Sequence, residues 1–193
     1  MPSSSLHRWF VERAATLADI ENAHRSVRGS GPGARAAAQQ INQAYAVLLS
    51  AQFQGFCRDL HSECAVYLVA AVADPDLREM LCDNLLFGRR IDRGNPNPGN
   101  IGSDFNRLGL AFWSLVDARR PENPARRASL EDLSGWRNAI AHQDFSTSMV
   151  KAGRPNLALV QVRFWRKACD GLARAFDEVL RDHLQALTGS APW

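Results

Sequence analysis

The stretch that decides the fold is residues 34–73, ARAAAQQINQAYAVLLSAQFQGFCRDLHSECAVYLVAAVA. Its apolar side chains recur every three or four residues, which is the spacing of one face of an α-helix. At about 1.5 Å per residue, an unbroken helix of this length would span roughly 55–60 Å, so we expect a kink, with Gly55 as the candidate position. The stripe consists of Ile41, Tyr45, Leu48, Leu49, Phe53, Phe56, Leu60, Cys64, Tyr67, Leu68 and Ala71.

The rest of the chain repeats this helical spacing between segments rich in glycine and proline. No alternating pattern of useful length indicates a strand, although residues 158–164 could be extended. The expected helices cover residues 5–27, 34–73, 75–87, 103–118, a segment starting at Ser129, and 157–187. The expected loops are Gly29–Gly33, Gly88–Asn100, Arg119–Pro124 and Phe145–Asn156.

Several helix ends carry recognisable start signals. The serines at positions 3–5 can cap the first helix, and Asp74-Pro75 places a proline at a first helical position. Ser103 and Ser129 are the predicted N-caps of two later helices. In Gly88–Asn100, two prolines and three glycines argue against any regular element. The last helix carries a predicted apolar stripe of Val160, Phe164, Ala168, Leu172, Phe176, Val179, Leu180, Leu184 and Leu187.

Length and composition indicate a single all-α domain over residues 1–193, a bundle of five or six helices. Within it, residues 1–28 hold the N-terminal helix and residues 157–187 the long C-terminal one. No apolar run reaches the roughly 18 residues of a membrane span, and Met1–Phe10 lacks the apolar centre of a signal peptide. We therefore expect a cytoplasmic protein that makes no membrane contact.

The positive charge comes almost entirely from arginine. Of 23 basic residues only Lys151 and Lys167 are lysine, and the formal net charge is +3. Arginine has a planar fork suited to phosphate, although genome composition alone would produce the same bias. The mild net charge does not by itself indicate nucleic acid.

Cys57, His61 and Cys64 are the one set of side chains with metal-ligand chemistry at helical spacing. They lie on the apolar stripe, and nothing nearby in the sequence supplies a fourth ligand for zinc. We therefore expect these residues to pack in the core, and we expect neither a metal nor another cofactor. The sequence also lacks a phosphate-binding loop and the motif of a serine hydrolase.

The segment Trp136–Asp144 (WRNAIAHQD) carries the remaining candidate chemistry in Arg137, Asn138 and His142. An ordinary histidine titrates near pH 6.5 and can pass protons, and arginine can stabilise a charged phosphate. Asparagine can orient either of them through hydrogen bonds. Together these groups suit cleavage of a phosphodiester by the adjacent 2′-hydroxyl, which needs no metal.

The helical spacing places these side chains on different faces. Asn138 and His142 are four residues apart and share a face, whereas Arg137 and His142 are about 140° apart around the axis. A long arginine side chain could bridge part of that angle. The plain alternative is that His142 is a surface histidine near a helix C-terminus, where the helix dipole favours it.

The motif Arg137-Asn138-Ala139-Ile140-Ala141-His142 resembles that of the HEPN superfamily, small all-helical domains named from higher eukaryotes and prokaryotes nucleotide-binding. The family motif is an arginine, four to six residues and a histidine, often with a polar residue after the arginine. The matching part of the chain is Ser129–Asp144. The long helices on either side agree in kind but carry no sharp signature.

The resemblance implies a HEPN-like two-fold dimer that acts as a metal-independent endoribonuclease. Arg137 would stabilise the phosphate, His142 would be the general acid or base, and Asn138 would orient them. Two copies would line one cleft, so that Arg137 of one copy works beside His142 of the other. The products would carry a 2′,3′-cyclic phosphate and a 5′-hydroxyl. Many family members are toxins or effectors of phage defence, which implies an antitoxin or regulatory protein as partner.

Two alternatives remain open at this point. A non-catalytic HEPN-like module could bind RNA, a nucleotide or a partner protein, and an unrelated helical regulatory protein could carry the motif by chance. We also expect a basic patch for RNA near the motif, formed by Arg126, Arg127, Arg163 and Arg166.

Overall fold

The computed structural model describes residues 1–27 and 31–193. These residues are predominantly α-helical, and the β structure among them is one hairpin whose two strands have two residues each. The all-α prediction is therefore confirmed. The predicted loop Gly29–Gly33 lies outside the described residues at positions 29 and 30, and it is wrong at Pro32 and Gly33, which open α3. The helices of twelve residues or more are α2 (Ala14–Ser26), α3 (Pro32–Ala70), α4 (Pro75–Leu86), α8 (Asn123–His142) and α9 (Leu159–Thr188).

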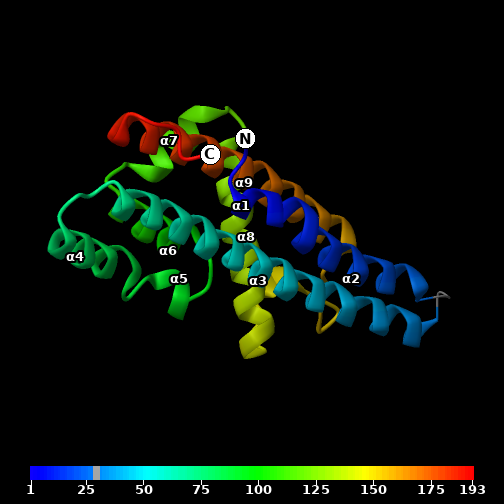
Figure 1. Ribbon diagram of the computed structural model, residues 1–193. Helices are drawn as coiled ribbons and strands as arrows, with labels where there is room; N and C mark the ends of the chain where they lie inside the picture. The colour runs from blue at the N-terminus through cyan, green and yellow to red at the C-terminus, as the bar shows by residue number, and fades with distance from the viewer. Residues whose placement is uncertain (28–30) are drawn as a thin grey trace.

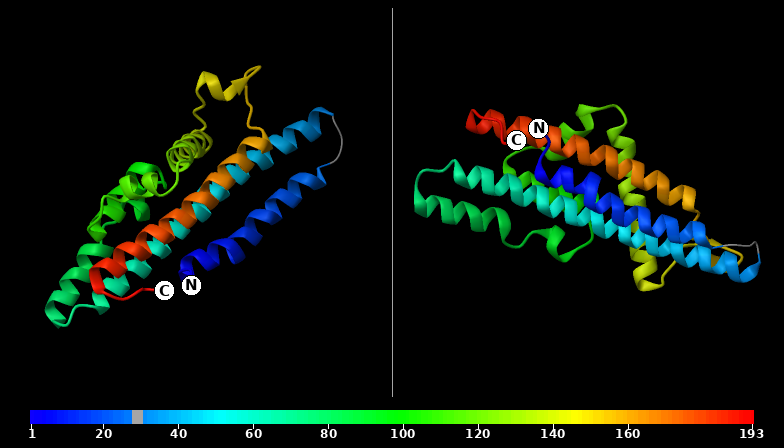
Figure 2. Two further views of the ribbon diagram at one scale, coloured as in Figure 1. Left: turned by 90° about the horizontal axis from the view of Figure 1, so that it is seen from above. Right: turned by 45° about the vertical axis from the view of Figure 1, so that its right-hand side comes forward.

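Three long rods lie side by side and form the body of the molecule (Figures 1 and 2). They are α3, α9, and a rod made of α1 (Ser4–Arg8), the π-helical turn Trp9–Arg13 and α2. The predicted cap is confirmed, because the Ser3 hydroxyl accepts the Leu6 N–H at 3.0 Å. Helix α8 runs across α3 and α9, so that its C-terminal end projects from the side of the body (Figure 2).

The core is aromatic where these rods meet. Phe176 of α9 lies within 6.0 Å of Phe53 and 4.8 Å of Phe112, measured between ring centroids. Trp9 packs edge-on against Phe53 at 5.6 Å, and its Nε1 donates to Asp170 at 2.9 Å. This continuous cluster joins the N-terminal rod, α3 and α9 into one core.

Helix α3 is one uninterrupted helix of 39 residues, and the expected kink at Gly55 is not present. The glycine has a different use. A Cβ at Gly55 would lie 2.5 Å from Nη1 of Arg13, whose guanidinium donates to Asp59 and Gln52 at 2.8 Å. The missing side chain therefore lets the N-terminal rod approach α3 closely.

The segment between α4 and α8 contains more helix than the sequence predicted. The prediction that Gly88–Asn100 excludes regular structure is wrong, because it contains α5 (Arg90–Arg93) and the start of α6 (Pro98–Phe105). Asn97 caps α6, since its Oδ1 accepts the N–H of Asn100 at 2.7 Å, and Pro98 occupies a position where proline needs no N–H partner.

The predicted helix over residues 103–118 is also wrong. Ser103 lies inside α6, which continues as a 3₁₀ turn over Asn106–Leu108. The chain then turns at Gly109 and starts again as α7 (Phe112–Arg119). The break follows from the left-handed conformation of Gly109, with φ of 87°.

Helix α8 begins six residues earlier than predicted, at Asn123 instead of Ser129. Pro124, predicted as the last residue of a loop, lies in the first turn of the helix, where proline is favourable. Ser129 is not a cap, because it lies inside the helix and its hydroxyl donates to the Ala125 carbonyl at 2.9 Å.

The last helix is confirmed, but its predicted stripe is wrong at both ends. Val160 and Phe164 are 72% and 57% exposed, and Leu187 is 58% exposed, whereas Val162 and Trp165 are fully buried. Steps of four residues turn about 40° beyond one full turn, so a strict four-residue repeat moves off the buried face. Residues 159–164 are helical, not extended.

Between α8 and α9 the chain is mostly irregular, as predicted. It also contains a 3₁₀ turn (Thr147–Met149) and a hairpin of β1 (Val150–Lys151) and β2 (Arg154–Pro155). Across residues 1–27 and 31–193, no helix combines the length and apolar character needed to cross a lipid bilayer.

Candidate active site

Helix α8 is anchored by its buried face. Leu133 is fully buried and Trp136 is 8% exposed, with the Trp136 ring 6.3 Å from that of Trp165 on α9. The indole of Trp165 donates to the Asp132 carboxylate at 3.0 Å. Because Trp136 points into the body of the protein, the residues that follow it turn towards the surface.

The helix ends immediately after His142. Gln143 adopts the left-handed conformation with φ of 55°, and its N–H still donates to the carbonyl of Ala139. The N–H of Asp144 donates to the same carbonyl at 3.1 Å, and the Gln143 side chain donates to the Ile140 carbonyl at 2.7 Å. His142 therefore occupies a well-defined last turn with its final carbonyls partly satisfied.

Asn138 is the best positioned of the three motif residues. Its Oδ1 accepts from Nδ2 of Asn95 at 2.8 Å and from Nη1 of Arg137 at 3.3 Å. Two donors on one oxygen fix which way the amide faces, so Nδ2 of Asn138 is directed away from them. That Nδ2 makes no hydrogen bond with the described residues, and it is available to donate to a ligand.

Two hollows open on either side of Asn138. The arginine hollow has a volume of about 410 Å³ and is lined by Arg93, Asn95, Asn97, Asn100, Arg137 and Asn138, together with Gln54, Asp92 and Gly94. The histidine hollow has a volume of about 360 Å³ and is lined by Asn138, His142, Asp144, Ser146 and Met149, together with Gly135 and Ala139. The structure therefore brings Asn138 and His142 into one hollow and places Arg137 in the other.

The arginine hollow has a surplus of positive charge. Its single carboxylate, Asp92, is engaged by Arg58 at 3.0 Å and by Arg89 at 2.9 Å. Neither Arg93 nor Arg137 forms an ion pair with any residue that the structure describes. Two guanidinium groups without a counter-charge, surrounded by amides, suit a phosphate.

His142 is exposed, and its ring makes no hydrogen bond within residues 1–27 and 31–193. Asp144 is the carboxylate in the same hollow. An imidazole in this position is accessible to a ligand from solvent. Among the described residues, no group orients the ring through a hydrogen bond.

Arg126 and Arg127, predicted to belong to a basic patch, lie in the first half of α8 and line neither hollow. Arg126 donates to Asn123 Oδ1 at 2.8 Å. Arg127 pairs with Asp117 at 2.9 Å and lies over the Trp113 ring, 5.3 Å from its centroid. Both guanidinium groups are thus engaged within the chain.

Arg163 and Arg166 lie on α9 and face the N-terminal rod and α3. Arg163 pairs with Glu21 at 2.6 Å, and this contact lowers the pKa of Glu21 although burial opposes the shift. Arg166 donates to the hydroxyl of Tyr45 at 3.1 Å. The structure does not bring these two arginines to the motif.

Cys57, His61 and Cys64 pack in the core as expected, each with no exposed surface. Burial raises the pKa of both thiols well above the ordinary value, which keeps them neutral. Among the described residues, no cluster of three histidine, cysteine or acidic side chains has the arrangement of a metal site.

Sequence reasoning missed two residues that line the arginine hollow, Asn95 and Arg93. Asn95 is 9% exposed, and its Oδ1 accepts the N–H of Asn97 at 3.2 Å while its Nδ2 holds Asn138. The Asn97-Pro98 pair is a recognisable helix start and would have identified α6. The contact from Asn95 to Asn138 spans 43 positions and has no local signal.

Comparison of the chain with protein-family models, with curated proteins and with solved structures finds no match in any of the three.

Proposed function

We propose that this protein is a metal-independent endoribonuclease in which Arg137, Asn138 and His142 act on RNA. The observation that carries the proposal is the position of Asn138. Its oxygen is fixed by Asn95 and Arg137, its Nδ2 is free among the described residues, and Asn138 lines a hollow together with His142. A phosphate bound there would meet the amide of Asn138 and the imidazole of His142, with Arg137 of the same chain in the neighbouring hollow.

The chemistry follows from these groups. The 2′-oxygen of the nucleotide attacks the adjacent phosphorus, and the bond to the 5′-oxygen breaks. His142 takes the proton of the 2′-hydroxyl or gives a proton to the leaving 5′-oxygen. The charge that develops on the phosphate is stabilised by Arg137 and by Nδ2 of Asn138. One product ends in a 2′,3′-cyclic phosphate and the other begins with a 5′-hydroxyl.

The complete site in this proposal is shared by two copies of the chain. Arg137 and His142 open into different hollows, and the His142 ring has no orienting partner among the described residues. A two-fold axis near Asn138 would set Arg137 of one copy beside His142 of the other. Such a contact uses the same surface on both copies, as two-fold dimers do.

The resemblance of the motif to HEPN domains supports this reading and extends it. We propose that the protein is a HEPN-like toxin or defence effector in the cytoplasm, held inactive by an antitoxin or another regulatory protein.

The test is cleavage of total RNA by the purified protein in excess chelator. We expect wild type to cut and His142→Ala to lose at least about 100-fold of the rate, because general acid–base catalysis contributes roughly 10²–10⁴. The matched control is His7→Ala, which removes another exposed histidine, from α1.

Three results would count against the proposal. Equal cleavage by wild type and His142→Ala would identify a contaminant. Cleavage that stops in chelator would show a metal requirement. If wild type binds RNA but does not cleave it, the protein is a non-catalytic HEPN-like module and not a ribonuclease.

A further inference from the structure

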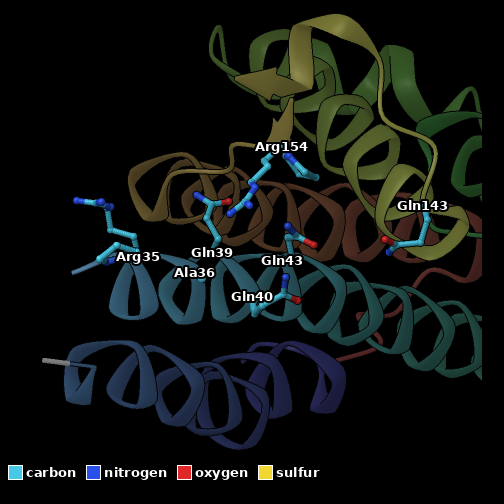
Figure 3. A pocket seen from close by; sticks show the side chains of 9 residues that line it. Arg35, Ala36, Gln39, Gln40, Gln43, Gln143 and Arg154 are labelled. Carbon is cyan, nitrogen blue, oxygen red and sulfur yellow. The ribbon is translucent and has the colours of Figure 1, made fainter. Parts of the chain in front are cut away.

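A third cavity lies on the other side of the end of α8, between that end, the first turns of α3, and β2 (Figure 3). Its volume is about 420 Å³, within the range of small-ligand sites. We call it the amide cavity. Its polar lining consists of Arg35, Gln39, Gln40, Gln43, Gln143 and Arg154.

Gln43 is the residue that points to a ligand. It is 8% exposed, lines the cavity, and makes no hydrogen bond within the described part of the chain. Its amide atoms are not among the fully buried side-chain atoms that lack a partner, so the Gln43 amide is accessible to a ligand in the cavity. The neighbouring Gln39 is fully used, because it accepts the N–H of Leu157 at 3.0 Å and donates to its carbonyl at 2.9 Å.

The charge of the amide cavity is positive. Two arginines line it and no carboxylate does. Arg154, on the hairpin, forms no ion pair with the described residues, and Figure 3 shows its side chain directed towards α3. The cavity therefore combines the guanidinium of Arg154 with the amide of Gln43, which makes no hydrogen bond with the described residues.

The location links this cavity to the histidine hollow. Gln143 lines the amide cavity, and His142, its neighbour in the chain, lines the histidine hollow. Consecutive Cα atoms are about 3.8 Å apart. The amide cavity and the histidine hollow therefore lie next to each other at the end of α8, on different sides of it.

We propose that the amide cavity binds one nucleotide of a single-stranded RNA, next to the phosphate that is cut. A base edge presents donors and acceptors side by side, and a glutamine amide matches this pattern. Gln43 pairs with the base edge, and Arg154 binds the phosphate of the same nucleotide. This inference rests on the proposed function, because it names the part of the substrate that the protein recognises.

The test uses calorimetric titration of the full-length protein with AMP, GMP, CMP and UMP as 5′-monophosphates, and with orthophosphate. We expect at least one nucleotide to bind more tightly than orthophosphate. Gln43→Met keeps the length of the side chain but removes the amide, and Arg154→Gln removes the charge. Each change should weaken nucleotide binding at least about tenfold, which is the loss expected from one good hydrogen bond or ion pair to a ligand. Retained thermal unfolding midpoints show that the variants are folded.

His7→Ala is the matched control, because it removes an exposed histidine from α1 that lines neither the amide cavity nor the histidine hollow. It should bind the nucleotides as wild type does. If Gln43→Met and Arg154→Gln also bind like wild type, or if no nucleotide binds more tightly than orthophosphate, the inference is wrong. If His142→Ala loses cleavage while Gln43→Met binds nucleotides like wild type, the proposed ribonuclease stands and the proposed nucleotide site is wrong. If nucleotide binding depends on Gln43 but the protein cuts no RNA, the nucleotide site stands and the proposed ribonuclease is wrong.

Discussion

His61 shows how burial fixes the protonation state of a single side chain in this protein. Burial lowers its pKa to about 4, and the guanidinium of Arg89 near Nδ1 acts in the same direction. Its Nε2 lies 3.0 Å from the Asp104 carbonyl, so the neutral ring donates there from Nε2. The folded protein therefore holds a neutral imidazole at every pH above about 4.

This environment predicts a loss of stability in acid. The unfolded chain binds a proton to His61 near pH 6.5, whereas the folded chain does so only near pH 4. Stability is therefore fully present above pH 6.5 and falls as the pH drops towards 4, by about 3 kcal/mol for this group. In urea unfolding at pH 7.5 and pH 4.5, His61→Leu should lose less stability on acidification than wild type does.

His7→Ala is the control for this measurement, since His7 is exposed on α1. It should keep the wild-type difference between the two pH values. An equal acid loss in His61→Leu and wild type would show that other groups cause the effect.

Asn95, Arg137 and Asn138 show which part of a site a sequence can indicate. Arg137, Asn138 and His142 are close in sequence and lie on one helix, so helical spacing alone places Asn138 with His142 and turns Arg137 away. The support from Asn95 depends on how α6 and α8 meet in three dimensions. The amide cavity likewise joins α3 to residues more than 100 positions away, and no local pattern records that.

At the scale of elements, the turn at Gly109 separates α6 from α7. Its φ of 87° lies in the region that other residues adopt at a cost, so Gly109→Ala should lower stability by about 1 kcal/mol. The matched change is Gly135→Ala in α8, where a Cβ would meet nothing within 4 Å. There alanine should stabilise the helix by roughly 0.5–1 kcal/mol.

Thermal unfolding of the two variants checks this pair of predictions. The midpoint should fall for Gly109→Ala and rise for Gly135→Ala. A neutral effect at Gly109 would show that the turn does not depend on glycine, and a lower midpoint for Gly135→Ala would show that α8 lacks the space the structure gives it.

The long helices were predictable because a buried stripe repeats over many turns. Helix α3 could be recognised from its apolar residues. The expected kink was wrong, and the predicted stripe extends too far, because the helix ends at Ala70 and Ala71 is exposed. The short helices α5 and α6 were not predicted, because the capping residues and prolines that open a helix are also typical of loops. The predicted apolar stripe of α9 is wrong at Val160 and Phe164. The partner helices decide which face of α9 is buried, and the sequence of α9 alone does not show this.

At the scale of the whole molecule, α8 crosses the long rods and ends at the side of the body (Figure 2). This arrangement places Arg137, Asn138 and His142 in two hollows at the surface. The proposed ribonuclease therefore requires a particle of about twice 21.4 kDa in solution. A monomer at micromolar concentration would exclude the shared site.

The most direct measurement mixes two inactive variants, Arg137→Ala and His142→Ala, and follows RNA cleavage in excess chelator. Each variant alone should be inactive. If Arg137 of one copy acts with His142 of the other, a mixed dimer contains one intact pair. After exchange of subunits, an equal mixture should then recover about a quarter of the wild-type rate, because about half of the dimers are mixed and each has one of two sites. A mixture that stays inactive while wild type cuts, with mixed dimers shown to form, would contradict the shared site.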